Sequence, residues 1–407
     1  SAMEIINAGL RKGDRPRLNL LFLGPSGVGK SYTPDVLSEH FFGKFKAYTD
    51  IDCGSIAGEH QGHGVATLRG APPGYIGYAD PERNPDYEFM PQPILSQWNI
   101  DKWAFIYKFE KEVEQKRDLY EELKKKLRDI GDQLREIKQK RGKGSKEYKD
   151  IWEELTKARK LKEEIESSAP DPLKFINSDE DRITIVNFDE IEKASEELRR
   201  LLLGILEKGI LDLADGRTTR FYHAFLFATS NIGSMEIAQM LKGGGLGFSQ
   251  SKSVSWDEVD KDTEKKLVEI ALSAARSFFA PEFLNRFDDI IVFRPLGKKE
   301  LLEILDKELG YLHQRIMDWG VIIRLEPEVK EYLVGKAAEN IEYGARDLRR
   351  TLEKNTIFPL AKLKNREAFG KGDVIYVALE EEPQRPGKKV LAFYRDKKPI
   401  LIEGPSA

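Results

Sequence analysis

The sequence has 407 residues, of which 40% are hydrophobic and 33% are charged, so it exceeds one ordinary hydrophobic core and predicts two or three globular parts. Its 66 Lys and Arg against 69 Asp and Glu leave a net charge of −3, which disfavours bulk nucleic-acid binding. No apolar run approaches the roughly 18 residues of a membrane span, and the single cysteine, Cys53, is typical of a reducing, cytoplasmic location.

Four short apolar runs predict the strands of a buried, mostly parallel sheet. They lie at residues 18–24, 183–188, 225–228 and 290–293, with helix-like patterns between them. Alternating strands and helices predict a doubly wound α/β domain. This domain would comprise residues 1–102 and 169–296, because the segment between them has a different character.

Residues 103–168 predict an inserted helical hairpin, a coiled coil. Apolar residues follow a heptad from Ile106 to Ile137 and again from Tyr148 to Ile165, and the glycine-containing stretch 141–145 is the expected turn. A first helix of roughly 35 residues would be about 50 Å long. The hairpin's own seam explains the apolar stripe, and docking of a partner is the alternative.

Residues 297–407 predict a second, smaller α+β domain. Amphipathic patterns predict helices at 299–319, 327–338 and 346–364. Strands are expected at 321–325, 374–379 and 390–394.

The loop after the first predicted strand has the Walker A pattern G-x-x-x-x-G-K-[ST]. Its residues are Gly24, Pro25, Ser26, Gly27, Val28, Gly29, Lys30 and Ser31. Glycines let backbone N–H groups converge on phosphate at a helix N-terminus, where Lys30 can reach the terminal phosphates and Ser31 can ligate magnesium. The pattern therefore predicts a site for ATP and Mg2+.

A second acidic motif ends the strand at residues 183–188. Asp189 and Glu190 follow this strand directly, as in a Walker B motif. Two adjacent carboxylates at a strand end suit two tasks, with Asp189 holding magnesium and Glu190 orienting the attacking water. A solvated strand end is the structural alternative.

Six ordered motifs together resemble the Clp/heat-shock AAA+ unfoldases, and most closely the second ATPase module of ClpB and ClpC. They are the two above and Gly70–Tyr78, Ala228–Asn231, Pro281–Arg286 and Tyr343–Arg346. The resemblance implies that Asn231 is sensor 1, that Arg286 is the arginine finger, and that Arg346 is the sensor 2 arginine. A finger that reaches a neighbouring subunit implies a homo-oligomeric ring, and the resemblance implies that this ring is a hexamer.

The resemblance also implies two binding loops. Tyr75, followed by Ile76, is similar to the pore-loop tyrosine that grips polypeptide in this family, although a tyrosine packed on its own domain is the alternative. The tripeptide Leu246, Gly247 and Phe248 resembles the one with which ClpC and ClpA dock on the ClpP peptidase. Local packing of that glycine-rich loop is the alternative.

Three features depart from the family pattern. The upstream segment that lines the adenine pocket is not found before the first strand. The hairpin interrupts the ATPase domain where ClpB has no middle domain, so its role is not transferred. Ala280 replaces an arginine that usually precedes the Pro-Glu-Phe motif, which leaves only Arg286 for the finger.

The expected function is an ATP hydrolase of the Clp type, a chaperone that threads unfolded or misfolded protein through a ring pore. The alternative is a nucleotide-gated interaction protein that uses the coiled-coil insertion and translocates little substrate. A nucleic-acid motor would need a basic pore or accessory domain, which the sequence does not indicate.

Overall fold

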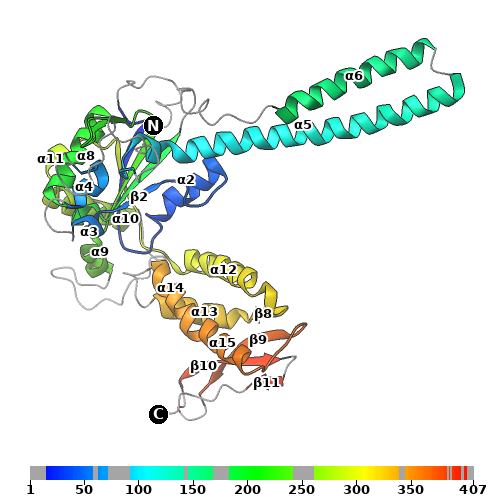
Figure 1. Cartoon of the computed structure of the whole chain (residues 1–407). Coiled ribbons are helices and arrows are strands. Elements are labelled where there is room, and N and C mark those ends of the chain that lie inside the picture. Colours follow the sequence, from blue (N-terminus) through cyan, green and yellow to red (C-terminus); the bar gives the residue numbers. More distant parts are fainter. Residues whose placement is uncertain are drawn as a thin grey trace.

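The structure is a computed structural model. It describes residues 15–57, 63–71, 92–141, 145–167, 183–241, 261–338, 344–382, 385, 387–395 and 398–400. The molecule has a large α/β domain, a helical hairpin that projects from it, and a small α+β domain (Figure 1). The predicted fold class is confirmed.

The large domain is built on a five-stranded parallel sheet with the order β2-β3-β6-β1-β7. The strands are β1 (Leu18–Leu23), β2 (Thr49–Asp52), β3 (Thr184–Asp189), β6 (Ala224–Ser230) and β7 (Asp289–Val292). The four predicted strands are present. The edge strand β2 was not predicted, because its four residues Thr-Asp-Ile-Asp contain one buried apolar side chain and no apolar run.

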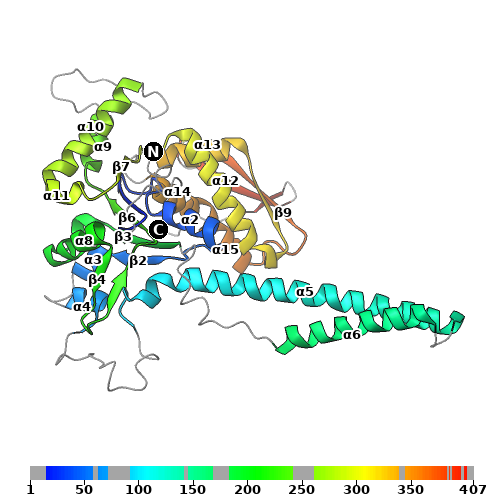
Figure 2. The ribbon, with the colours of Figure 1, turned by 90° about the horizontal axis from the view of Figure 1, so that it is seen from above.

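Helices and a short ribbon surround this sheet (Figure 2). The helices are α2 (Tyr32–Phe42), α3 (Cys53–Ala57), α4 (His63–Arg69), the 3-10 turn η2 (Ile191–Lys193), α8 (Glu196–Lys208), α9 (Ser234–Leu241), α10 (Lys261–Phe278) and α11 (Pro281–Leu284); the ribbon pairs β4 (Ile210–Asp212) with β5 (Thr218–Arg220). The amphipathic α8 shows why such segments are helical. Ser195 caps its N-terminus and Gly209 its C-terminus, and the leucines of one stripe enter the core of the sheet.

The hairpin consists of α5 (Gln97–Arg141) and α6 (Lys146–Ser167). At 45 residues, α5 is longer than expected and spans about 67 Å. Its first turns belong to the large domain, where Ala104 is buried and Tyr107 packs against Phe42 of α2. Beyond this base the two helices share a seam that includes Ile130, Leu134 and Leu155.

The small domain packs helices on a sheet with the order β11-β10-β9-β8. Its elements are α12 (Lys298–Arg315), η4 (Met317–Trp319), β8 (Ile322–Leu325), α13 (Pro327–Ala338), α14 (Gly344–Leu352), the π-helical turn η6 (Glu353–Ile357), α15 (Phe358–Asn365), β9 (Val374–Glu381), β10 (Lys389–Arg395) and β11 (Lys398–Ile400). One core cluster fills it, from Leu301 to Phe393. The helix predicted over 346–364 is thus α14, η6 and α15 in succession.

Among the described residues, no helix combines the length and the apolar character needed to cross a bilayer.

Candidate functional site

The loop between β1 and α2 has the backbone of a phosphate-binding loop. Gly24, Gly27 and Gly29 adopt positive φ angles of 139°, 73° and 105°, which side-chain-bearing residues rarely tolerate. A Cβ on Gly24 would lie 2.4 Å from the carbonyl oxygen of Phe293, so the strand end requires glycine at this position. The predicted glycine loop therefore stands at the N-terminus of α2, where anions bind favourably.

Lys30 is buried in this loop with 6% of its surface exposed. Its ammonium group donates hydrogen bonds to the carbonyl oxygens of Gly24 and Pro25, at 2.7 and 2.6 Å, and to Oδ1 of Asn231 at 2.9 Å. Burial lowers the pKa of Lys30 to about 8, although the carboxylate of Glu192 opposes this shift. The ammonium is thus held by neutral acceptors that a phosphate oxygen could replace.

The two carboxylates at the end of β3 have different partners. Asp189 accepts a hydrogen bond from the Ser31 hydroxyl, with 2.9 Å between Oγ and Oδ1. Glu190 has a left-handed backbone, with φ of 55°, and its carboxylate pairs with Lys193 at 2.5 Å. Ser31 and Asp189 supply the hydroxyl and carboxylate oxygens that Mg2+ prefers, so these residues fit the predicted metal.

Asn231, at the end of β6, joins the two halves of the site. Its side-chain amide accepts from Lys30 through Oδ1 and donates through Nδ2 to Glu190, at 3.3 Å. Its backbone N–H donates to Glu192 Oε1 at 3.1 Å. The structure therefore brings together Lys30, Ser31, Asp189, Glu190 and Asn231 at the carboxyl edge of the sheet, where parallel α/β sheets bind ligands.

Thr229 is a site residue that the sequence interpretation missed. It is 1% exposed, and its hydroxyl donates a hydrogen bond to Asp189 Oδ1. The hydroxyl oxygen of Thr229 also accepts a hydrogen bond from the backbone N–H of Glu190, at 3.1 Å. One hydroxyl thus orients both acidic residues. Thr229 belongs to the motif Ala228–Asn231, whose sequence is Ala-Thr-Ser-Asn, but a threonine in a buried strand is usually a packing residue.

The two arginines of the motifs lie in different surroundings. Arg346, in the first turn of α14, is close enough for its charge to lower the pKa of Lys30. The preceding Ala345 donates its N–H to the carbonyl oxygen of Gly27 at 3.0 Å, which holds the small domain against the glycine loop. Arg286 instead pairs with Glu207 of α8 at 3.2 Å. Its guanidinium is thus not part of the hydrogen-bond network around Lys30.

The predicted loop residues Tyr75, Ile76, Leu246, Gly247 and Phe248 lie outside the described residues.

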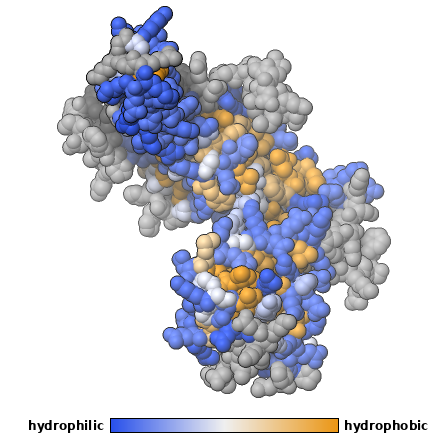
Figure 3. All heavy atoms as spheres, turned by 90° about the vertical axis from the view of Figure 1, so that its right-hand side faces the viewer, coloured by the Kyte–Doolittle hydropathy of each residue, from blue (hydrophilic) through white to orange (hydrophobic). Residues whose placement is uncertain are grey.

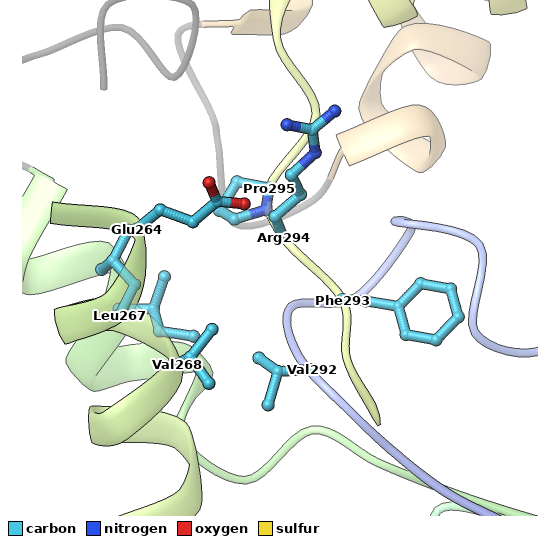
Figure 4. Close-up of a pocket in the computed structure, with 8 residues that line it drawn as sticks. Glu264, Leu267, Val268, Val292, Phe293, Arg294 and Pro295 are labelled. Carbon is cyan, nitrogen blue, oxygen red and sulfur yellow. The ribbon is translucent and has the colours of Figure 1, made fainter. Parts of the chain in front are cut away.

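A small pocket of about 60 Å3 is open where the large domain joins the small domain (Figure 4). Its apolar side comes from Leu267, Val268 and Val292, and Glu264 and Arg294 lie at its rim. The pocket adjoins the segment that connects the two domains, and its lining includes none of Asp189, Glu190 and Asn231.

Two family models match consecutive parts of the chain. The AAA domain (Cdc48 subfamily) matches residues 172–290, and the C-terminal, D2-small domain of ClpB protein matches residues 296–377. The boundary between these matches lies close to the segment between β7 and α12, which connects the two domains.

Curated relatives match nearly the whole chain. An ATP-dependent Clp protease ATP-binding subunit ClpA homolog of Cyanidium caldarium is 29% identical over 383 residues, which cover 94% of this chain and 33% of the relative. The chaperone protein ClpB of Staphylococcus epidermidis is 26% identical over 94% of this chain and 31% of the relative. The chloroplastic chaperone protein ClpD of Arabidopsis thaliana is 26% identical over 93% and 30%, respectively. The chain thus spans about a third of the length of these relatives, and the resemblance inferred from the motifs is confirmed.

Proposed function

We propose that this chain, an AAA+ protein of the Clp/heat-shock type, hydrolyses ATP in a homo-oligomeric ring and uses the energy to unfold or remodel proteins. The observation that carries the proposal is the hydrogen-bond chain from Lys30 through Asn231 to Glu190, beside the Ser31–Asp189 pair. It supports the proposal because a cation suited to phosphate, a carboxylate suited to orienting water and two oxygens suited to a metal then lie at one edge of the sheet.

Each side chain has a defined task in this proposal. Lys30 exchanges its carbonyl partners for phosphate oxygens, and Ser31 and Asp189 hold magnesium, which neutralises phosphate charge when bound. Glu190 orients the attacking water and accepts its proton, while Asn231 positions the Glu190 carboxylate. Arg346 stabilises the charge that develops on the phosphate, since the small domain already contacts the glycine loop.

Arg286 would act in a neighbouring subunit. Its present partner, Glu207, lies on the same chain, and the pair is partly exposed. We propose that ring assembly replaces this ion pair by the neighbour's phosphate, which is a stronger acceptor for a guanidinium. A hexamer, a cytoplasmic location and docking of a ClpP-type peptidase through Leu246, Gly247 and Phe248 belong to the same proposal.

Replacement of Glu190 by Gln tests the hydrolytic step. The amide keeps the size of the side chain but accepts no proton, so ATP binding should persist while turnover falls by about a hundredfold or more. Turnover within about twofold of the parent would refute the assignment. Binding is measured by calorimetry and turnover by phosphate release.

Replacement of Tyr75 by Ala tests polypeptide threading. An aromatic ring that contacts substrate contributes contact area without a role at the phosphates, so basal ATPase activity should remain near normal while translocation of an unfolded fluorescent substrate is lost. Translocation at the parent's rate would refute the role of Tyr75. If the parent hydrolyses ATP but moves no substrate, the threading function itself is refuted.

The second candidate is the nucleotide-gated interaction protein, and one contact favours it. Helix α2 begins next to Ser31 and ends at Phe42, which packs against Tyr107 at the base of the hairpin with ring centroids 6.0 Å apart. Lys44, just after α2, pairs with Glu110 of α5 at 2.5 Å. Nucleotide-dependent movement of α2 would therefore reach the hairpin. Attaching a fluorophore to the hairpin and comparing its signal with and without nucleotide distinguishes this function.

A further inference from the structure

The distal half of the hairpin has two sides of opposite charge. The seam residues Ile130 and Leu134 of α5 face Ile151 and Leu155 of α6. In an antiparallel helix pair, residues one position before the seam on both helices share one side, and residues one position after it share the other. Lys126 and Glu154 both precede seam residues, and their 3.0 Å ion pair across the helices agrees with this assignment.

The side that follows the seam, here called the basic side, has positively charged residues and an aromatic ring. Its members include Arg128, Gly131, Arg135, Lys138, Lys149, Trp152, Thr156 and Arg159. Arg135 has an ion pair with Asp132, at 3.2 Å. Within the described part of the hairpin, Arg128, Lys138 and Lys149 have no such partner. This side therefore has uncompensated positive charge.

Trp152 adds apolar surface to the basic side. It stacks on Tyr148 with ring centroids 6.2 Å apart, yet 49% of its surface is exposed. Gly131 lies on the same side in the middle of α5, and no atom lies within 4 Å of the position its Cβ would occupy. A mid-helix glycine costs roughly 1 kcal/mol relative to alanine, so this open position suits the close approach of another surface.

The side that precedes the seam, here called the acidic side, has the complementary charge. Its acidic members are Asp129, Glu136, Glu147, Asp150 and Glu154. Three lysines also lie here, but Lys126, Lys140 and Lys157 are paired with Glu154, Glu136 and Glu153. Among the described residues of the hairpin, no ion pair involves Asp129 or Asp150, so both carboxylates can pair with an outside cation.

The two sides lie at the same height along the hairpin. Arg128 and Asp129 are neighbours in sequence, as are Lys149 and Asp150, so each pair lies equally far from the large domain. A second copy displaced sideways, without sliding along the hairpin, would bring its Asp129 and Asp150 against Arg128 and Lys149 of the first. A contact that joins different surfaces of two copies gives a ring when the rotation between copies closes, so this contact is compatible with the proposed ring.

We propose that the hairpins of neighbouring copies in the ring pack side by side, with the basic side of one against the acidic side of the next. The inference rests on the proposed ring and assigns the inserted hairpin a role in holding it together. Charge should govern the contact, because the hairpin end that faces the viewer in Figure 3 is covered mostly by hydrophilic residues.

Crosslinking between two variants tests the direction of the contact. One chain has Lys138→Cys on the basic side and the other has Glu147→Cys on the acidic side, with both positions near the connecting turn. The native Cys53 is buried and should not react. The variants are mixed with a slowly hydrolysed ATP analogue and a short bismaleimide, and ring formation is checked by electron microscopy.

The expected result is an adduct between the two variants, with at least about tenfold less adduct of either variant with itself. Rings without the mixed adduct would overturn the hairpin contact while leaving the proposed ring intact. Adducts of each variant with itself would show like surfaces meeting, which also overturns it. Absence of rings would refute both the ring and the contact that depends on it.

Charge exchange provides an independent test. Arg128→Glu with Lys149→Glu, and separately Asp129→Lys with Asp150→Lys, should each lower the crosslinking yield about tenfold. All four substitutions in one chain restore complementarity and should restore the yield. Lys125→Glu with Lys160→Glu is the matched control, since both lysines point away from the seam and from both sides. Failure of the fourfold variant to recover would refute charge pairing, as would an equal loss in the control.

Discussion

Replacing Thr229 by Val should disable the site without unfolding the protein. Valine is β-branched like threonine, so it can fill the same space in the middle of the sheet, where Thr229 is 1% exposed. The substitution removes the donor to Asp189 and the acceptor for the backbone N–H of Glu190. Both acidic residues lose their orientation while their charges remain.

The size of the effect follows from these two hydrogen bonds. A hydrogen bond to a charged group contributes about 1.5–3 kcal/mol, and an unsatisfied buried N–H costs about 1–3 kcal/mol. If only the bond to the carboxylate is reflected in the transition state, turnover should fall by about 10- to 150-fold. The loss should include a higher magnesium requirement, since Asp189 is the proposed metal-binding carboxylate.

The assay compares three chains by phosphate release at varied magnesium concentration and by thermal melting. Thr229→Ser retains the hydroxyl and should keep activity within a few-fold. Thr229→Val should lose activity and should melt cooperatively, only several degrees below the parent, because one backbone N–H is left unpaired. The reasoning is wrong if the valine chain hydrolyses ATP within about twofold of the parent. It is equally wrong if the serine and valine chains are impaired to the same extent.

Three further predictions concern charge, backbone and domain boundary. Burial lowers the pKa of Lys30 to about 8, so ADP affinity measured by calorimetry should fall as pH rises from about 7 to 9. The free energy of unfolding should rise between about pH 8 and 10.5, because in this range only the unfolded chain binds the proton. Lys30→Met should remove both trends. Gly24→Ala should lower the unfolding free energy by at least about 2 kcal/mol more than Gly29→Ala, because its Cβ meets a backbone oxygen whereas that of Gly29 meets open space; equal losses in denaturant titrations would contradict this. Replacing residues 112–164 by a glycine-serine linker should preserve cooperative melting. Replacing residues 103–166 should lower the melting temperature, because this deletion removes side chains of the large-domain core. A lower melting temperature for the shorter deletion than for the longer one would show that the distal hairpin supports the core.

Local patterns were enough to identify several parts of the site. The glycine spacing of the loop and the apolar run before Asp189 and Glu190 predicted a phosphate site at strand ends, and the structure brings Lys30, Ser31 and both acidic residues together. Such motifs are readable because each requires only a few neighbouring residues with particular backbone freedom or charge.

Side-chain partners could not be read in the same way. The polar Asn187 of β3 donates to Asp50 of β2 at 2.8 Å, a partner 137 residues away in an unpredicted strand. Arg286 pairs with Glu207, a contact that depends on how α8 packs beneath the sheet. These partners are set by strand order, and sequence periodicity does not specify which strands become neighbours.

The sequence by itself determined the types of most elements, the glycine-rich loop, the two acidic residues and the presence of a hairpin, because periodicity, glycine spacing and short motifs are properties of adjacent residues. Only the tertiary structure decided that Asn231 links Lys30 to Glu190, and that the Thr229 hydroxyl bonds both the Asp189 carboxylate and the backbone N–H of Glu190. It also decided that α5 begins at Gln97, inside the large domain. The start of this helix is set by its packing against that domain and not by the first residue of its heptad pattern. The physical reason is that parallel strands bring residues far apart in sequence to one edge, and the partners chosen there depend on the whole fold.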